Sequence, residues 1–227
     1  NQARMLTGAL LAMKTIASEP VVGERLVEIA EDTNAPTVRR TQALLALEGN
    51  PPASALSRIA SLATTRTLDP GLRTAAFDRL TDLRNRDALT HLWPLIELAA
   101  TTAAETRERG MATDVGLIIS GPEGVSEVLS RLPSDRSPYY SSQELNGYGL
   151  AIAQMNPAPM ELMRGLLGSP NWWIRIVALR FLQHGGSEED IARMEGLASD
   201  SAATNGPDWL QLNTVGKVSE HALEQLR

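Results

Sequence analysis

The stretch that decides the fold runs from residue 69 to residue 80 and reads Asp69-Pro70-Gly71-Leu72-Arg73-Thr74-Ala75-Ala76-Phe77-Asp78-Arg79-Leu80. An aspartate followed by a proline is typical of a helix start, because the carboxylate caps free N–H groups and proline fits the first turn. The apolar side chains that follow recur at spacings of three and four residues, which places them on one face of a helix. The stretch therefore predicts an amphipathic helix that packs against a neighbour.

The pattern Arg-x-x-Ala-[Leu/Phe]-x-x-Leu occurs three times in the chain without gaps. The copies begin at Arg40, Arg73 and Arg175, and a proline lies a few residues before each of them. The first two arginines are 33 residues apart and the last two are 102 apart, which is three times 34. Degraded copies lie about where this period requires them, around residues 101–156. A fixed period of this length predicts a repeat architecture.

A second amphipathic segment separates each pattern from the next. These segments cover residues 20–32, 52–64, 86–100, 123–132, 158–167 and 187–198. Each has apolar residues at spacings of three and four, and no segment shows the sustained alternation of a strand. The sequence therefore predicts an all-α protein of about six helical hairpins, or roughly 12 to 13 helices. We expect residues 1–227 to form a single domain, whose weaker repeats lie around residues 101–156.

The stretch from Asp69 to Leu80 is similar to the second helix of HEAT repeats, particularly the short bacterial kind that also occurs in phycobilisome-lyase-type proteins. Residues 36–47 and 170–182 resemble it more loosely, because no aspartate precedes their prolines. The resemblance implies an armadillo-like α-solenoid, that is, a right-handed α-α superhelix. It implies little about activity, since such stacks serve as scaffolds, lyases, repair enzymes and adaptors.

The composition agrees with thin helical layers and excludes several chemistries. The chain has 32 Leu and 29 Ala against 10 Val and 10 Ile, and only nine aromatic residues, which favours helices joined by interfaces of small and medium side chains. It has no cysteine, which excludes disulfides, cysteine zinc sites, iron–sulfur clusters and thiol nucleophiles. The formal net charge of -6 argues against a general affinity for nucleic acids or anionic membranes.

Motifs of catalysis and of metal binding are missing from the sequence. His91, His184 and His221 lie far apart and lack a partner at the spacing of a zinc helix. No nucleophile elbow, phosphate-binding loop or dinucleotide fingerprint occurs. The acidic run Glu188-Glu189-Asp190 is interpreted as charge at a helix N-terminus, and Asp78 with Asp82 as a solvated face. We therefore expect no cofactor, no metal and no catalytic residue.

The repeated arginines have a structural interpretation. The stems of Arg40, Arg73 and Arg175 can lie over the core, and their guanidinium groups can bond to carbonyls or acids of a neighbouring repeat. Contact with a ligand is the other interpretation of these three residues.

Two groups of residues are candidates for binding. Taking the repeat residues of the third copy as its core side, a helical projection places Trp173, Arg180 and His184 on the opposite side. Trp173 either covers the adjacent repeat or forms an aromatic anchor on the concave surface, a residue type enriched at binding hot spots. Tyr139 and Tyr140 form the second candidate contact, unless their segment is a flexible linker.

These observations favour a non-catalytic scaffold module whose concave surface binds a protein or peptide. One alternative is a HEAT-like DNA-repair glycosylase, in which Trp173 stacks on a lesion and Asp78 polarises it, and a further alternative is a bilin lyase or chaperone. We expect no nucleic-acid partner and no membrane insertion. The chain is expected to be water-soluble, either cytoplasmic or exported with its signal segment missing from this sequence.

Overall fold

The computed structural model describes residues 13–17, 19–49, 51–134, 140–204 and 212–226 of the chain. Within these ranges the chain forms eleven α-helices and three short 3-10 helices, with an isolated bridge between Ala203 and Thr214 and no strand. The prediction of an all-α protein is confirmed. The chain divides into two compact units, unit 1 (Asn1–Trp93) and unit 2 (Pro94–Arg227).

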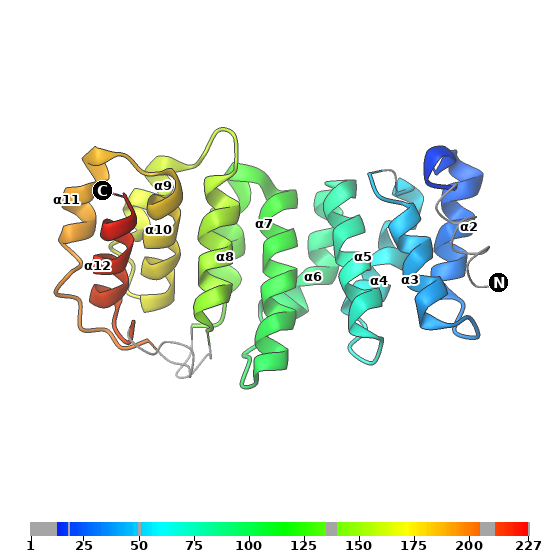
Figure 1. Ribbon diagram of the computed structural model, residues 1–227, viewed down its shortest axis with the longest axis horizontal. Helices are drawn as coiled ribbons and strands as arrows, with labels where there is room; N and C mark the ends of the chain where they lie inside the picture. The colour runs from blue at the N-terminus through cyan, green and yellow to red at the C-terminus, as the bar shows by residue number, and fades with distance from the viewer. Residues whose placement is uncertain (1–12, 18, 50, 135–139, 205–211, 227) are drawn as a thin grey trace. The chain divides into compact units, whose positions relative to one another are not determined.

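Unit 1 consists of antiparallel helical hairpins. Its elements are η1 (Lys14–Ile16), α2 (Pro20–Glu31), α3 (Thr37–Ala46), η2 (Ala53–Ala55), α4 (Leu56–Thr64), α5 (Pro70–Leu83) and η3 (Arg86–Ala88). Helix α2 packs against α3, α4 packs against α5, and α3 contacts α5 (Figure 1). The hairpins therefore meet through their second helices, which carry the first two copies of the arginine pattern.

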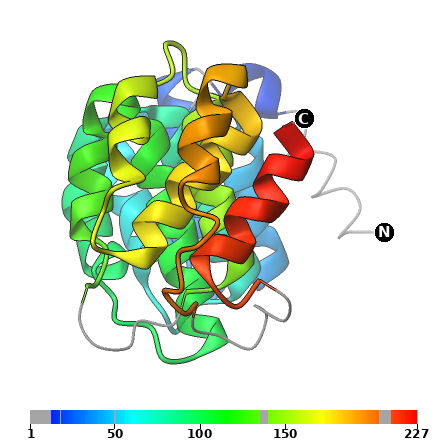
Figure 2. The same cartoon turned by 90° about the vertical axis from the view of Figure 1, so that its left-hand side faces the viewer.

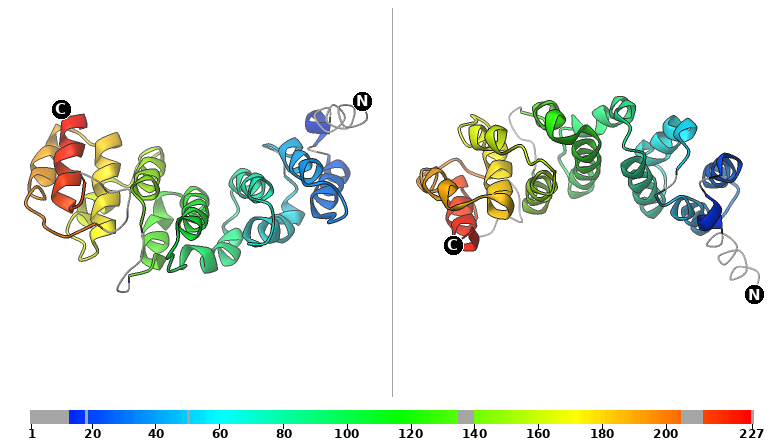
Figure 3. Two further views of the ribbon diagram at one scale, coloured as in Figure 1. Left: turned by 60° about the horizontal axis from the view of Figure 1, so that its bottom comes forward. Right: turned by 90° about the horizontal axis from the view of Figure 1, so that it is seen from above.

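Unit 2 contains α7, the longest helix of the described residues. Its elements, the first of which begins in unit 1, are α6 (Leu89–Ile96), α7 (Ala103–Arg131), α8 (Ser142–Ala153), α9 (Met160–Leu166), α10 (Trp172–Gly185), α11 (Glu188–Glu195) and α12 (Val215–Leu226). Helix α8 packs between α7 and α10, and α10 also contacts α9 and α12 (Figure 3). Helices α11 and α12 lie side by side (Figure 2).

Local sequence signals explain most helix boundaries. The Asp69 side chain accepts hydrogen bonds from the N–H groups of Gly71 and Leu72, as the cap at the start of α5 requires. Ser187 and Asp190 form a reciprocal capping box at the start of α11. Helix α7 breaks at Gly121, whose φ of 67° suits glycine, and Pro122 follows it. The predicted segment at residues 123–132 is thus the second part of α7.

The repeated arginines bond within their own hairpins. Arg40 Nε donates to the carbonyl of Ala30 at 2.7 Å, and Arg73 Nε donates to the carbonyl of Ala63 at 3.0 Å. Each acceptor lies ten residues upstream, in the last turn of the preceding helix, where carbonyls lack an intrahelical partner. Arg40 and Arg73 thus make the expected bond to a backbone carbonyl. In both cases the acceptor belongs to the same hairpin as the arginine and not to a neighbouring one.

The third repeated arginine, Arg175, bonds to the loop before α10 and to an acidic residue further along the chain. Arg175 Nη1 donates to the carbonyl of Ser169 at 2.6 Å, and its Nε forms an ion pair with Asp200 at 2.8 Å. Asp200 also accepts a hydrogen bond from the N–H of Ala202. Arg175 therefore ties the start of α10 to the segment that follows α11.

Polar contacts inside each unit recur at sequence separations of 34 or 35 residues. They are Lys14–Glu48 at 2.5 Å, Arg58–Glu24 at 2.8 Å and Arg79 Nη1 to the Leu44 carbonyl at 3.0 Å in unit 1, and Arg131–Glu97 at 2.7 Å in unit 2. Matching positions in successive hairpins are therefore neighbours within a unit. Among the described residues, no helix combines the length and the apolar content that crossing a membrane requires.

Candidate functional site

A buried ion pair joins α7 to α8 in unit 2. Arg109 Nε lies 2.8 Å from Glu144 Oε1, and Arg109 Nη2 lies 3.0 Å from Glu144 Oε2. Arg109 Nη1 donates to the Leu98 carbonyl at 3.1 Å, and the Tyr148 hydroxyl donates to Glu144 Oε1 at 2.6 Å. Both members of the pair are buried. The two-pronged geometry and the additional bonds compensate the charges, which burial would otherwise penalise.

An aromatic stack extends this ion pair toward α10. The guanidinium carbon of Arg109 lies 4.0 Å from the ring centroid of Tyr140, and Tyr140 stacks on Trp173 with centroids 5.3 Å apart and an interplanar angle of 15°. Trp172 meets both rings edge-on. The Tyr140 hydroxyl donates to the Pro133 carbonyl at 3.0 Å. The stack therefore fixes the end of the loop before α8 against the first turn of α10.

The residues predicted to bind a partner are mostly buried. Trp173, Tyr140 and Arg180 expose 4%, 0% and 6% of their surface, whereas His184 is exposed and Tyr139 lies outside the described residues. The helical projection placed Trp173 and Arg180 away from the core. Both sides of α10 are covered, because α8 and α12 each pack against it. Trp173 therefore packs inside unit 2, and its ring is not an exposed anchor in this structure.

Arg180 lies at a close contact between α8 and α10. Its Nη1 donates to Gln183 Oε1 at 2.7 Å, and burial lowers the pKa of its guanidinium. A Cβ added to Gly149 would lie 2.5 Å from Arg180 Cβ and 2.8 Å from the backbone nitrogen of Phe181. Gly149 therefore permits α8 and α10 to approach each other. The neighbouring Gly147 is not at this contact and faces α7.

A second carboxylate, that of Asp114 on α7, lies close to the buried ion pair. Asp114 is half-buried, and its oxygens lie 3.8 and 3.9 Å from the position that a Cβ on Gly147 would occupy. Its Oδ1 is buried and receives no hydrogen bond from any described group. Burial, together with the nearby negative charge of Glu144, raises the pKa of Asp114 to about 7. This carboxyl is thus poised between its protonated and ionised forms near neutral pH.

Two exposed apolar side chains lie one turn beyond Asp114 and Gly147. Helices α7 and α8 advance in the same direction, because Arg109 pairs with Glu144 and Asp114 lies against Gly147. Ile118, four residues after Asp114, is 42% exposed, and Leu150, three residues after Gly147, is 37% exposed. We call Asp114, Gly147, Ile118 and Leu150 the Asp114 surface. It combines a carboxylate that lacks a donor with apolar side chains open to solvent.

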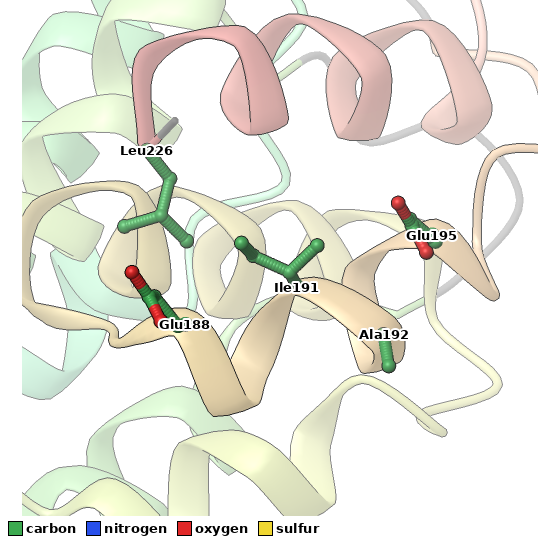
Figure 4. A pocket seen from close by; sticks show the side chains of 5 residues that line it. All are labelled: Glu188, Ile191, Ala192, Glu195 and Leu226. Carbon is green, nitrogen blue, oxygen red and sulfur yellow. The ribbon is translucent and has the colours of Figure 1, made fainter.

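An open pocket of about 460 Å³ lies between α11 and α12. Ile191 and Leu226 face each other across it, and Glu188 and Glu195 flank them (Figure 4). Its lining is apolar in the middle and acidic at the edges. Ala192 completes the lining on α11.

Other carboxylates of the sequence have structural partners. Asp190 is buried, caps α11 and pairs with Arg164 of α9 at 2.7 Å, and the bonds from Arg164 hold its pKa below the usual range. Asp82 pairs with Arg79 at 2.9 Å and accepts a hydrogen bond from the Gly49 N–H at 2.9 Å. The sequence interpreted Asp190 as charge at a helix N-terminus and Asp82 as part of a solvated face. The structure adds bonds from each of these two residues to another part of the chain. In the described part of the chain, no three His, Asp or Glu side chains gather as ligands for a metal ion.

Sequence reasoning missed the Arg109–Glu144 pair and the Asp114 surface. Arg109 occupies the repeat position in a degraded copy, and Glu144 follows it by 35 residues, the separation that the repeat contacts share. That spacing is the signal that could have found the pair. No family model matches the chain, and no curated protein matches it.

Proposed function

We propose that the chain is a non-catalytic interaction module, built as a HEAT-like α-solenoid, that binds a protein or peptide on the face lined by the second helices of its hairpins. Two features support the architecture. Arg40 and Arg73 make the same bond ten residues upstream, and contacts at 34 or 35 residues link successive hairpins within each unit. Both are expected of stacked units of one kind.

The distribution of exposed apolar side chains carries the proposed function. The described residues expose six large apolar side chains, and four of them lie on second helices: Val38 and Leu45 on α3, Ile118 on α7 and Leu150 on α8. Val38 is 68% exposed and Leu45 is 47% exposed. Each unit thus has two such side chains on second helices, and exposed apolar side chains that gather on one surface mark a site that a partner covers.

The structure gives less support to the alternative of a DNA-repair glycosylase. A glycosylase that stacks Trp173 on a damaged base needs that ring at the surface, but it is buried against Tyr140. The net charge of -6 also opposes a duplex, whose phosphates require basic side chains.

Selection of a random dodecapeptide library against the immobilised protein tests this proposal. We expect enriched peptides that bind saturably in the micromolar range and compete with one another for one surface. One of two double variants, Val38→Ser with Leu45→Ser in unit 1 or Ile118→Ser with Leu150→Ser in unit 2, should weaken binding while the thermal unfolding curve stays unchanged. Absence of any saturable binder, or a stable complex with duplex DNA at physiological salt, would overturn the proposal.

A further inference from the structure

The Asp114 surface has an acceptor that lacks a donor. None of the described residues donates a hydrogen bond to Oδ1 of Asp114, although this oxygen is buried. The nearby Glu144 is already bonded by Arg109 and Tyr148, so it has found its partners inside unit 2. A buried acceptor without a donor is unfavourable, and a group from outside the chain that supplies an N–H bond would remove this cost.

Charge decides which kind of donor fits. A neutral donor would satisfy the oxygen but leave the negative charge of Asp114 uncompensated beside Glu144, whereas a cation supplies both the hydrogen bond and the opposite charge. An acidic group or a phosphate would be repelled by Asp114, by Glu144 and by the chain as a whole, which carries a net charge of -6. Because burial and Glu144 raise the pKa of Asp114 to about 7, an approaching cation would also favour the ionised form.

The surroundings of Asp114 provide apolar contacts at the surface. Gly147 of α8 faces Asp114 without adding a side chain, since a Cβ there would lie 3.8 Å from the carboxylate. Ile118 and Leu150 are exposed one turn further along the two helices. A long basic side chain buries its methylene stem on such apolar neighbours while its charged end meets the carboxylate.

We propose that the Asp114 surface binds a lysine or arginine side chain of a protein partner, and that Ile118 and Leu150 contact the apolar residues beside it. This inference rests on the proposed interaction function and names the chemistry that the partner supplies. The occupant is a segment with one essential basic residue between apolar ones. Charge complementarity and the missing donor distinguish this surface from the other exposed apolar residues of the chain.

The test uses the best binder from the dodecapeptide selection and its isosteres. In the isosteric peptides each arginine is replaced by citrulline and each lysine by norleucine, one at a time, which removes the charge and keeps the shape. We expect one of these replacements to weaken binding to the wild-type protein at least about tenfold in fluorescence anisotropy. The Asp114→Asn variant should bind the unmodified peptide weakly, and it should lose little more with the isostere.

Matched variants keep the result interpretable. Glu195→Gln changes one acid of the α11–α12 pocket and should leave the affinity unchanged, whereas Ile118→Ser should weaken binding at an exposed position where unfolding is not expected. Circular dichroism melting shows whether each variant is folded. If Asp114→Asn proves unstable, loss of binding in folded Ile118→Ser, together with the isostere effect, still tests the inference.

Several outcomes would overturn the inference. If peptides bind but Asp114→Asn binds them equally, or if no basic residue of the peptide matters, the inference is wrong and the interaction function stands. If Glu195→Gln abolishes binding, the acidic pocket is the site. If sedimentation shows a dimer that Asp114→Asn dissociates, the occupant is a second copy of the chain. If the library yields no binder, the proposed function itself is wrong.

Discussion

Arg73 in unit 1 and Arg109 in unit 2 occupy the same position of the repeat but meet different partners. Arg73 bonds to the Ala63 carbonyl at 3.0 Å, and Arg109 makes the comparable bond to the Leu98 carbonyl at 3.1 Å. Arg109 also makes two bonds to a buried carboxylate on the next second helix and a contact with an aromatic ring. The bond to a carbonyl joins the two helices of one hairpin, whereas the bonds to Glu144 join two successive second helices.

The difference teaches how a repeat position acquires an additional role. A bond to a neutral carbonyl adds no second charge to the interior. Glu144 brings a negative charge into the interior, which requires compensation. This charge also helps to raise the pKa of the half-buried carboxyl of Asp114. In unit 2 a buried pair of charges therefore joins two successive second helices, and one carboxylate there lacks a donor among the described groups.

Removing Glu144 should have the largest effect. Glu144→Ala leaves Arg109 buried without its carboxylate and Tyr148 without its acceptor, so we expect a loss of about 3–5 kcal/mol in the free energy of unfolding. Urea denaturation followed by circular dichroism measures it. The control Glu97→Ala breaks the exposed pair with Arg131 and should cost less than about 1 kcal/mol. Equal costs for the two variants would show that the buried pair is not special.

Asp114→Asn should stabilise the protein at high pH. The folded state raises the pKa of Asp114 from 3.8 to about 7, so between these values the unfolded chain releases a proton that the folded chain retains, and stability falls as pH rises. Asparagine does not ionise. The variant should therefore exceed the wild type by on the order of 2–4 kcal/mol at pH 8 and by little at pH 4. Urea midpoints at the two pH values measure this difference.

A loss of stability in Asp114→Asn at pH 8 would contradict this prediction. It would show that the ionised carboxylate is stabilised within the folded chain, and the contrast between Glu144, which has partners, and Asp114, which lacks a donor, would disappear. No difference between the variant and the wild type at either pH would mean that Asp114 titrates as it does in the unfolded chain.

The helices could be predicted from the sequence because their signals are local. Asp69-Pro70 predicted the start of α5. The apolar spacing predicted a helical segment at residues 20–32, and α2 spans Pro20–Glu31, which ends one residue earlier. Each of these features depends on residues within a few turns of one another, which a single sequence displays.

The site could not be predicted in the same way, because the exposure of each of its residues depends on which helices pack over it. A helical projection of α10 identifies which residues share a face, but it does not show that α8 and α12 cover both faces of the helix. The projection therefore placed both Trp173 and Arg180 opposite the core side, and it left open whether Trp173 covers the adjacent repeat or is an exposed anchor. Both residues are buried. The Asp114 surface arises from a pairing of α7 with α8 across 33 residues, and only the tertiary register brings Asp114 to Gly147.

Filling the contact between α8 and α10 should have an intermediate effect. In Gly149→Ala the new Cβ would lie 2.5 Å from Arg180 Cβ and 2.9 Å from its carbonyl carbon, so the helices must separate, at a cost of about 1–3 kcal/mol. Gly165→Ala in α9 is the matched control, because nothing lies within 4 Å of its Cβ and alanine favours the helix by up to about 1 kcal/mol. Thermal melts of both variants should therefore shift in opposite directions.

The smallest effect is expected for the arginine of unit 1. Arg73→Met keeps most of the apolar stem and removes the bond to Ala63, which leaves a carbonyl without that donor and should cost about 1–2 kcal/mol. Arg40→Met should cost about the same, since Arg40 makes the same bond to Ala30. Because the acceptor is neutral in both cases, neither cost should exceed that of Glu144→Ala, which strands a buried charge. If Arg73→Met proved as damaging as Glu144→Ala, the bond within the hairpin would be the main support of the repeat, and the charged link between α7 and α8 would be an addition of little consequence for stability.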